Sequence, residues 1–81
     1  YVKEVFDKDY ELISLIGNVS LVDNKSFIHT HISFSDTKFK VFGGHLFDAE
    51  VIAAAEFCIF MSDYHLHRKL NCNIGLNLWD I

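Results

Sequence analysis

Residues 27–34, FIHTHISF, alternate between two sets of side chains at every step. Successive side chains of a β-strand point to opposite faces of a sheet, so this alternation predicts a single strand with two different faces. One face carries Ile28, Thr30, Ile32 and Phe34, and the other carries Phe27, His29, His31 and Ser33.

Turn-forming residues bound this strand on both sides. Residues 23–25 (DNK) predict a hairpin turn before it, and residues 35–38 (SDTK) predict another turn after it. Upstream, residues 11–16 (ELISLI) and 18–22 (NVSLV) predict two short strands separated at a Gly-Asn pair. Downstream, residues 39–42 predict a strand that runs into two glycines. Short strands with short turns indicate a mostly antiparallel sheet, either a meander or a small barrel-like sheet.

The run at residues 51–61, VIAAAEFCIFM, is ambiguous between strand and helix. Its AAAE centre favours a helix, whereas its β-branched and aromatic flanks are apolar on both faces, as in a strand buried on both sides. Periodicity does not separate the two alternatives, and we expect a strand. Residues 62–73 predict a polar connection, and residues 74–81 (IGLNLWDI) predict a final short segment.

The size and composition of the chain indicate one small folded domain. Its 81 residues are 51% hydrophobic, with 8 Phe and no Pro, which excludes a disordered chain. A chain of this size buries only about 60% of the surface that its unfolded form exposes. The apolar content exceeds what such a domain can hide alone, which favours a homo-oligomer.

Charge and cysteine content restrict the classes of function. The net charge of −4 and 7 scattered Lys and Arg residues disfavour a nucleic-acid-binding face, so no residue is assigned to DNA contact. Cys58 and Cys72 form neither a disulfide framework nor a zinc knuckle. We expect Cys58 to be a buried thiol and the protein to be cytoplasmic. No run approaches the roughly 18 apolar residues of a membrane span, and we expect no signal peptide.

Three histidines form the best candidate for a functional site. His29 and His31 are two residues apart on one strand face, about 7 Å along the chain. His45 follows Gly43-Gly44, and a hairpin through residues 35–38 would return it to the same end of the sheet. Three imidazoles would hold zinc or another divalent transition metal, with a fourth position open. The alternative is a set of solvent-facing or hydrogen-bonded histidines.

A second histidine pair occurs at His65 and His67, in a polar segment. The adjacent Arg68 and Lys69 would repel a cation, so we interpret this pair as part of a solvated loop.

Carboxylates near the histidines offer further candidates. We expect the turn residues Asp36, Asp48 and Glu50 to be solvated, with hydrogen bonding to a ligand imidazole as the alternative. Glu56 differs because it lies inside the apolar run, where a carboxylate needs a partner or a raised pKa. It is the one candidate for a catalytic acid or base.

Three motifs occur in order along the chain: GNVS at residues 17–20, FIHTHISFSD at 27–36 and VFGGHL at 41–46. Together they resemble the prokaryotic form of the plant and prokaryote conserved (PPC) domain, and IGLNL at residues 74–78 is similar to the closing segment of that family. This resemblance implies an α+β domain with a mostly antiparallel sheet that assembles as a homotrimer. Residues 1–81 would form the C-terminal two-thirds or so of the usual domain, so we expect an upstream segment with a helix and the first strands.

The resemblance also bears on function. It implies a metal at His29, His31 and His45, and it places Glu56 where the family tends to have an acidic residue. The acetolactate decarboxylases share the general fold and hold zinc through histidines, a link at fold level only. Plant members bind A·T-rich DNA through a separate basic AT-hook, and no such motif occurs in this chain.

Three interpretations therefore stay open. The first is a metal-binding, homotrimeric module of a DNA-associated or regulatory protein. The second is a zinc-dependent enzyme acting on a small oxo-acid-like molecule, with Glu56 moving protons. The third is direct DNA binding, which the acidic charge and the missing AT-hook disfavour.

Overall fold

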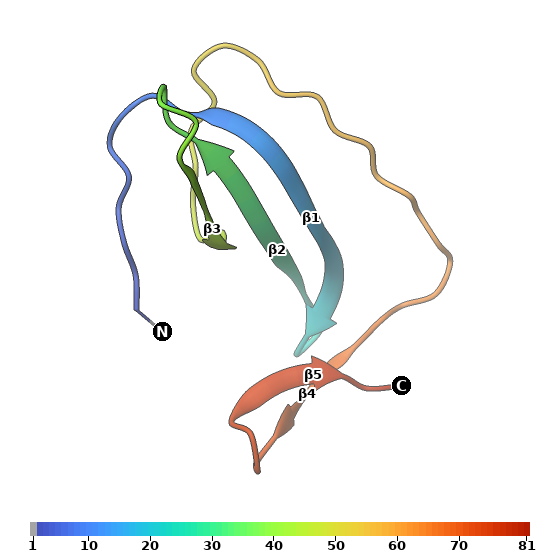
Figure 1. Cartoon of the computed structure of the whole chain (residues 1–81). Coiled ribbons are helices and arrows are strands. Elements are labelled where there is room, and N and C mark those ends of the chain that lie inside the picture. Colours follow the sequence, from blue (N-terminus) through green and yellow to red (C-terminus); the bar gives the residue numbers. More distant parts are fainter. Residues whose placement is uncertain (1) are drawn as a thin grey trace.

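The structure, a computed structural model, describes residues 2–81 and contains five strands in two antiparallel sheets (Figure 1). The first sheet has the order β1-β2-β3, and the second is a β4-β5 hairpin that lies next to the turn between β1 and β2. The strands are β1 (Glu11–Val22), β2 (Lys25–Ser35), β3 (Val41–His45), β4 (Arg68–Asn71) and β5 (Leu76–Trp79).

The β1–β2 hairpin confirms the strand predicted at residues 27–34. Its turn contains Asp23 and Asn24 with φ of 51° and 62°, the left-handed geometry that tight hairpins require and that Asp and Asn tolerate. β1 is longer than predicted because it continues through Gly17 and pairs with β2 almost to its start, with a single bulge between Leu12 and Ser14.

The β2–β3 turn is stabilised by Asp36, whose Oδ1 accepts backbone N–H bonds from Lys38 and Lys40, each at 2.9 Å. Phe39 adopts a positive φ of 65° inside this turn. The prediction of a strand from residue 39 is therefore shifted, and β3 begins at Val41 and includes His45.

An aromatic cluster covers one face of the first sheet. Phe34 and Phe42 are directly opposite each other on β2 and β3, with ring centroids 5.8 Å apart. Phe6 and Tyr10 pack edge-on against Phe34, each with centroids 5.0 Å away. These contacts attach the segment before β1 to the sheet.

The β4–β5 hairpin corrects the prediction of a polar connection over residues 62–73, because β4 lies within it. Asn71 Oδ1 accepts N–H bonds from Asn73 and Ile74 in the turn, and Gly75 provides a φ of 77°. The hairpin meets the first sheet where the Leu21 N–H donates to the Leu66 carbonyl at 2.8 Å.

The prediction of a strand at residues 51–61 is wrong. This run has no strand or helix, and Figure 1 shows it within the yellow-to-orange segment that runs around the outside of the sheets. A strand buried on both faces needs a partner on each side, and no strand in residues 2–81 pairs with this run. Phe57 and Phe60 are accordingly 77% and 96% exposed, and Cys58, expected to be buried, is exposed.

The α+β and barrel-like expectations also need correction. Residues 2–81 contain no helix, so the described chain is all-β, and no helix that could cross a membrane occurs in it. A barrel requires hydrogen bonds between its first and last strands. Here β1 and β3 are both edges of an open three-stranded sheet, and β4–β5 forms a separate one.

Close approach at Gly17 predicts a sensitive position in β1. A Cβ at Gly17 would overlap the His29 carbonyl oxygen and lie 2.8 Å from the Thr30 Cα, both in β2. We expect Gly17→Ala to lower the free energy of unfolding by about 1–3 kcal/mol, since backbone atoms must move to accommodate the methyl group. Urea denaturation measures the change. Glu11→Ala, an exposed change on the same strand, should stay within about 0.5 kcal/mol, and equal effects would contradict the close packing.

Candidate metal centre

The three predicted histidines lie together on one face of the first sheet. His29 and His31 project from β2, and His45 projects from β3 directly opposite His31. Ring centroids are 5.0 Å apart for His29 and His31, 5.2 Å for His29 and His45, and 4.4 Å for His31 and His45. One ring nitrogen from each lies within 4.8 Å of the other two.

The local sequence explains this convergence. The pairs Ser33–Gly43 and Ile32–Gly44 bring β3 against β2, and a Cβ at Gly43 would be only 2.9 Å from the Ile32 carbonyl oxygen. Pairing continues past His45, where the Leu46 N–H donates to the Thr30 carbonyl at 3.0 Å. Glycine therefore permits the close approach, and the register places His45 beside His31.

The donor set fits a divalent transition metal. Zinc bound at about 2.0–2.1 Å by tetrahedral nitrogen ligands places those nitrogens about 3.3 Å apart. The histidine nitrogens would have to approach one another from within 4.8 Å, a movement that rotation about the side-chain bonds of exposed His31 and His45 supplies. The arrangement can therefore hold one ion and leave a fourth position open.

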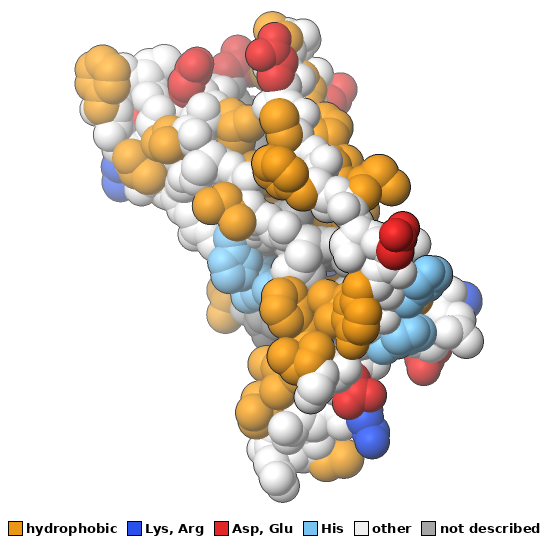
Figure 2. Space-filling model, turned by 90° about the vertical axis from the view of Figure 1, so that its right-hand side faces the viewer, with side chains coloured by type: hydrophobic (Ala, Val, Ile, Leu, Met, Phe, Trp, Pro, Cys, Tyr) orange, Lys and Arg blue, Asp and Glu red, His pale blue; other side chains and the backbone are white. Residues whose placement is uncertain are grey.

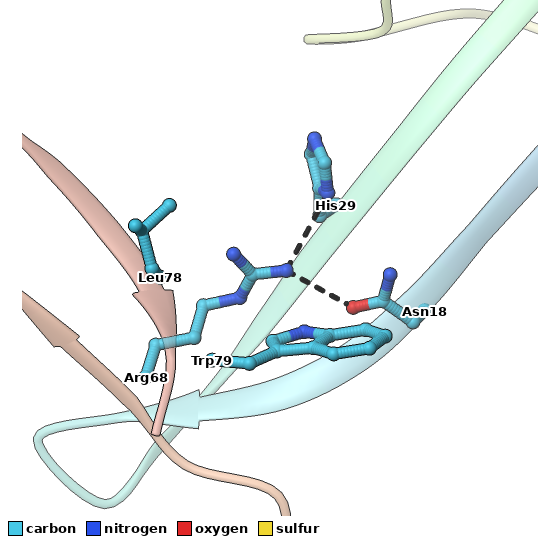
Figure 3. A pocket seen from close by; sticks show the side chains of 5 residues that line it. All are labelled: Asn18, His29, Arg68, Leu78 and Trp79. Carbon is cyan, nitrogen blue, oxygen red and sulfur yellow. Dashed lines mark hydrogen bonds between the residues drawn. The ribbon is translucent and has the colours of Figure 1, made fainter. Parts of the chain in front are cut away.

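Arg68 at the start of β4 connects the second sheet to this histidine face. Its Nε donates to Ser20 Oγ at 2.7 Å, its Nη1 to the Asn77 carbonyl at 2.9 Å, and its Nη2 to Asn18 Oδ1 at 3.2 Å. Nη2 also lies 3.4 Å from His29 Nδ1 (Figure 3). Ser20 is the only residue buried in the described part of the chain.

A pocket of about 410 Å³ opens beside this contact. Asn18, His29, Arg68, Leu78 and Trp79 line it, and Figure 3 shows the indole of Trp79 beneath the guanidinium, with His29 on the other side. His29 thus belongs both to the histidine cluster and to the pocket, so a ligand in the pocket would lie next to a bound ion.

Sequence reasoning missed Arg68, Asn18 and Trp79 as members of this site. It treated Arg68 as part of a solvated loop that repels cations. The signal available was the alternation of Leu66, Arg68 and Leu70 with polar residues, which is typical of a short strand. In the structure Leu66 and Arg68 are half-buried, whereas Leu70 is exposed. No sequence signal places this short strand against β1.

The environment of His29 favours its neutral form. Partial burial lowers the pKa of His29 below its ordinary value of 6.5, and the positive charge of Arg68 and then His31 and His45 lower it further. Because a metal binds the neutral imidazole, this shift keeps a lone pair available to lower pH.

The other sequence candidates lie outside the cluster. Asp36 caps the β2–β3 turn, and its Oδ1 accepts backbone N–H groups. The remaining ones are exposed and do not join the histidine group among the described residues: Asp48, Glu50, Glu56, His65 and His67.

Comparison with known proteins identifies a family and a structural neighbour. The family model of the Plants and Prokaryotes Conserved (PCC) domain matches residues 1–63, which include β1–β3 and the three histidines. A crystal structure from Bacteroides thetaiotaomicron, named a "putative DNA binding protein", superposes with a TM-score of 0.88 at 29% identity. The match covers 93% of this chain and 52% of that one, so this chain spans about half the length of that protein. No curated protein matches the sequence.

The lowered pKa of His29 predicts an acid-sensitive fold. Its imidazole accepts a proton less readily when folded than when unfolded, so the unfolded chain gains protons first and stability falls as the pH drops below 6.5. We expect the His29 ring signals in NMR to titrate with a midpoint below 6.5, with His29→Gln identifying the signals. A midpoint at or above 6.5 would contradict the environment described for this ring.

Proposed function

The chain belongs to the Plants and Prokaryotes Conserved family, and from that premise we propose that it is a metal-binding, self-assembling module. His29, His31 and His45 would hold zinc or another divalent transition metal. The observation that carries this proposal is the convergence of three imidazole nitrogens from two paired strands within 4.8 Å.

The chemistry of the donor set supports a transition metal over calcium or magnesium. Imidazole suits zinc, copper, nickel and iron, whereas calcium and magnesium prefer oxygen ligands. No carboxylate joins the histidine group among the described residues. Three protein ligands with an open position are typical of metal sites that also bind a small molecule.

The pocket favours a second candidate function on the same site. A zinc-dependent enzyme acting on a small oxo-acid-like molecule would need a cavity beside the metal, and the pocket that shares His29 with the cluster supports this candidate. A bound metal would supply Lewis-acid chemistry there. Glu56 is exposed and outside the cluster, so it gives this candidate no acid or base.

The name of the structural neighbour suggests an association with DNA, and this chain would contribute to it indirectly. The net charge of −4 opposes contact with phosphates. We therefore propose a module of a DNA-associated or regulatory protein, in which the module assembles and binds the metal and other segments contact DNA.

Self-assembly would cover an apolar face of the first sheet. Residues paired across strands share a face, so Leu15, Val19 and Ile28 project opposite to the histidines. They are 43%, 57% and 67% exposed, and no apolar side chain is buried in residues 2–81. Figure 2 shows hydrophobic side chains spread over much of the visible surface. Exposed apolar area on this scale favours association, and the family resemblance suggests a trimer.

Metal content tests the first part of the proposal. Protein purified without a His tag and dialysed against zinc should retain about one zinc per chain by elemental analysis. The His29→Ala/His31→Ala variant should retain none, because a single histidine of the cluster remains. The His65→Ala/His67→Ala variant removes the other histidine pair and should match the unchanged protein. Equal zinc in all three would contradict the assignment.

Light scattering after size exclusion tests the second part. The measured mass should be three times that of one chain. Ile28→Asp should reduce it to the mass of a single chain, since burying a carboxylate in an apolar interface is costly. Ile16→Asp places the same charge on the histidine face and should leave the mass unchanged. A monomeric unchanged protein would contradict self-assembly.

A further inference from the structure

We propose that the pocket beside the histidines binds the carboxylate of a small organic acid, with Arg68 as the receptor group. The inference rests on the proposed function in one respect, because it places this carboxylate next to the proposed metal. It assigns a ligand class and a binding residue to a pocket whose walls are Asn18, Arg68, Leu78 and Trp79 as well as His29.

The charge of Arg68 is not neutralised by the protein. Its hydrogen-bond acceptors are a hydroxyl, an amide oxygen, a backbone carbonyl and an imidazole nitrogen, all uncharged. No carboxylate lies within ion-pair distance of it in residues 2–81. A half-buried guanidinium without a counter-ion favours an anion from solution, and carboxylate matches its planar fork.

The guanidinium is also held in place before any ligand arrives. Its Nε and Nη1 are fixed by Ser20 and the Asn77 carbonyl, and its carbon lies 5.3 Å from the Phe27 ring centroid and 6.0 Å from that of Trp79. Of its five N–H groups, one on Nη1 has no hydrogen-bond acceptor in the described chain. A ligand therefore loses little free energy in ordering the receptor.

Metal binding would release a second N–H group. A neutral imidazole has one nitrogen with a lone pair and one that carries a proton, and guanidinium only donates. The Arg68 Nη2 contact at 3.4 Å therefore uses the lone pair of His29 Nδ1. A metal on Nδ1 takes that lone pair, and a metal on Nε2 leaves the proton on Nδ1. Either choice ends the contact and frees the Nη2 N–H for a carboxylate.

The walls of the pocket indicate the rest of the ligand. Leu78 and Trp79 offer an apolar side chain and a flat indole, and the volume of about 410 Å³ admits a molecule of several heavy atoms. The two N–H groups that Arg68 could offer, one on Nη1 and one on Nη2, match the two oxygens of a carboxylate. We expect a small carboxylic acid with a planar or apolar remainder.

Pyruvate serves as the probe, and isothermal calorimetry measures its dissociation constant with and without one equivalent of zinc. Trp79 is the only tryptophan of the chain, so a change in its emission reports occupancy of this pocket. Zinc should tighten pyruvate binding several-fold. Methyl pyruvate, which lacks the charge, should bind about tenfold or more weakly, because a charge-assisted hydrogen bond is lost.

Two variants separate the receptor group from general charge. Arg68→Lys keeps the positive charge but loses the planar fork, and it should weaken pyruvate binding about tenfold or more while retaining zinc. Lys69→Met removes the neighbouring, exposed charge on the same strand and should leave both ligands unaffected. Because the methyl pyruvate comparison uses the unchanged protein, the test does not depend on how Arg68→Lys folds.

The outcomes distinguish this inference from the proposed function. Zinc binding with equal affinities for pyruvate and methyl pyruvate, or with no loss in a folded Arg68→Lys variant, would overturn the carboxylate site alone. Absence of zinc binding would overturn the metal proposal and the coupling. Arg68-dependent pyruvate binding in the metal-free protein would still support the carboxylate site.

Discussion

The register of β2 against its two neighbours is the constraint on which the rest of the structure depends. β2 pairs with β1 over nearly its whole length and with β3 at its end, so each of its side chains has a fixed face. A slip of one residue would move every side chain to the other face. The aromatic cluster and the histidine cluster both depend on this single alignment, one on each face of the sheet.

A second constraint is the set of hydrogen bonds by which Arg68 connects the two sheets. One side chain joins β4 to β1 through Ser20 and Asn18, and the same guanidinium reaches His29. The group that attaches the hairpin to the sheet is therefore also part of the chemical site. Packing and the candidate site therefore meet at this residue. Under the proposed metal binding, ligation of His29 would alter one hydrogen bond of the side chain that joins the two sheets.

The sequence predicts the short-range features well and the long-range ones poorly. Alternation over residues 27–34 and turn residues at 23–25 locate the first hairpin, and the spacing of the histidines anticipates their convergence, because local pairing determines all three. The run at residues 51–61 looks like a buried strand, but its structure depends on partners that the described chain does not provide. Arg68 belongs to a contact 50 residues away from Asn18 along the chain, and no local pattern encodes that contact.

The most direct test of the central claim is X-ray absorption at the metal edge of the zinc-loaded protein. If the three histidines hold the ion, the spectrum will show nitrogen or oxygen neighbours at about 2.0–2.1 Å and the outer-shell scattering of imidazole rings. The exposed thiols of Cys58 and Cys72 are the competing ligands. Sulfur scattering at about 2.3 Å, or a first shell without imidazole, would contradict the account.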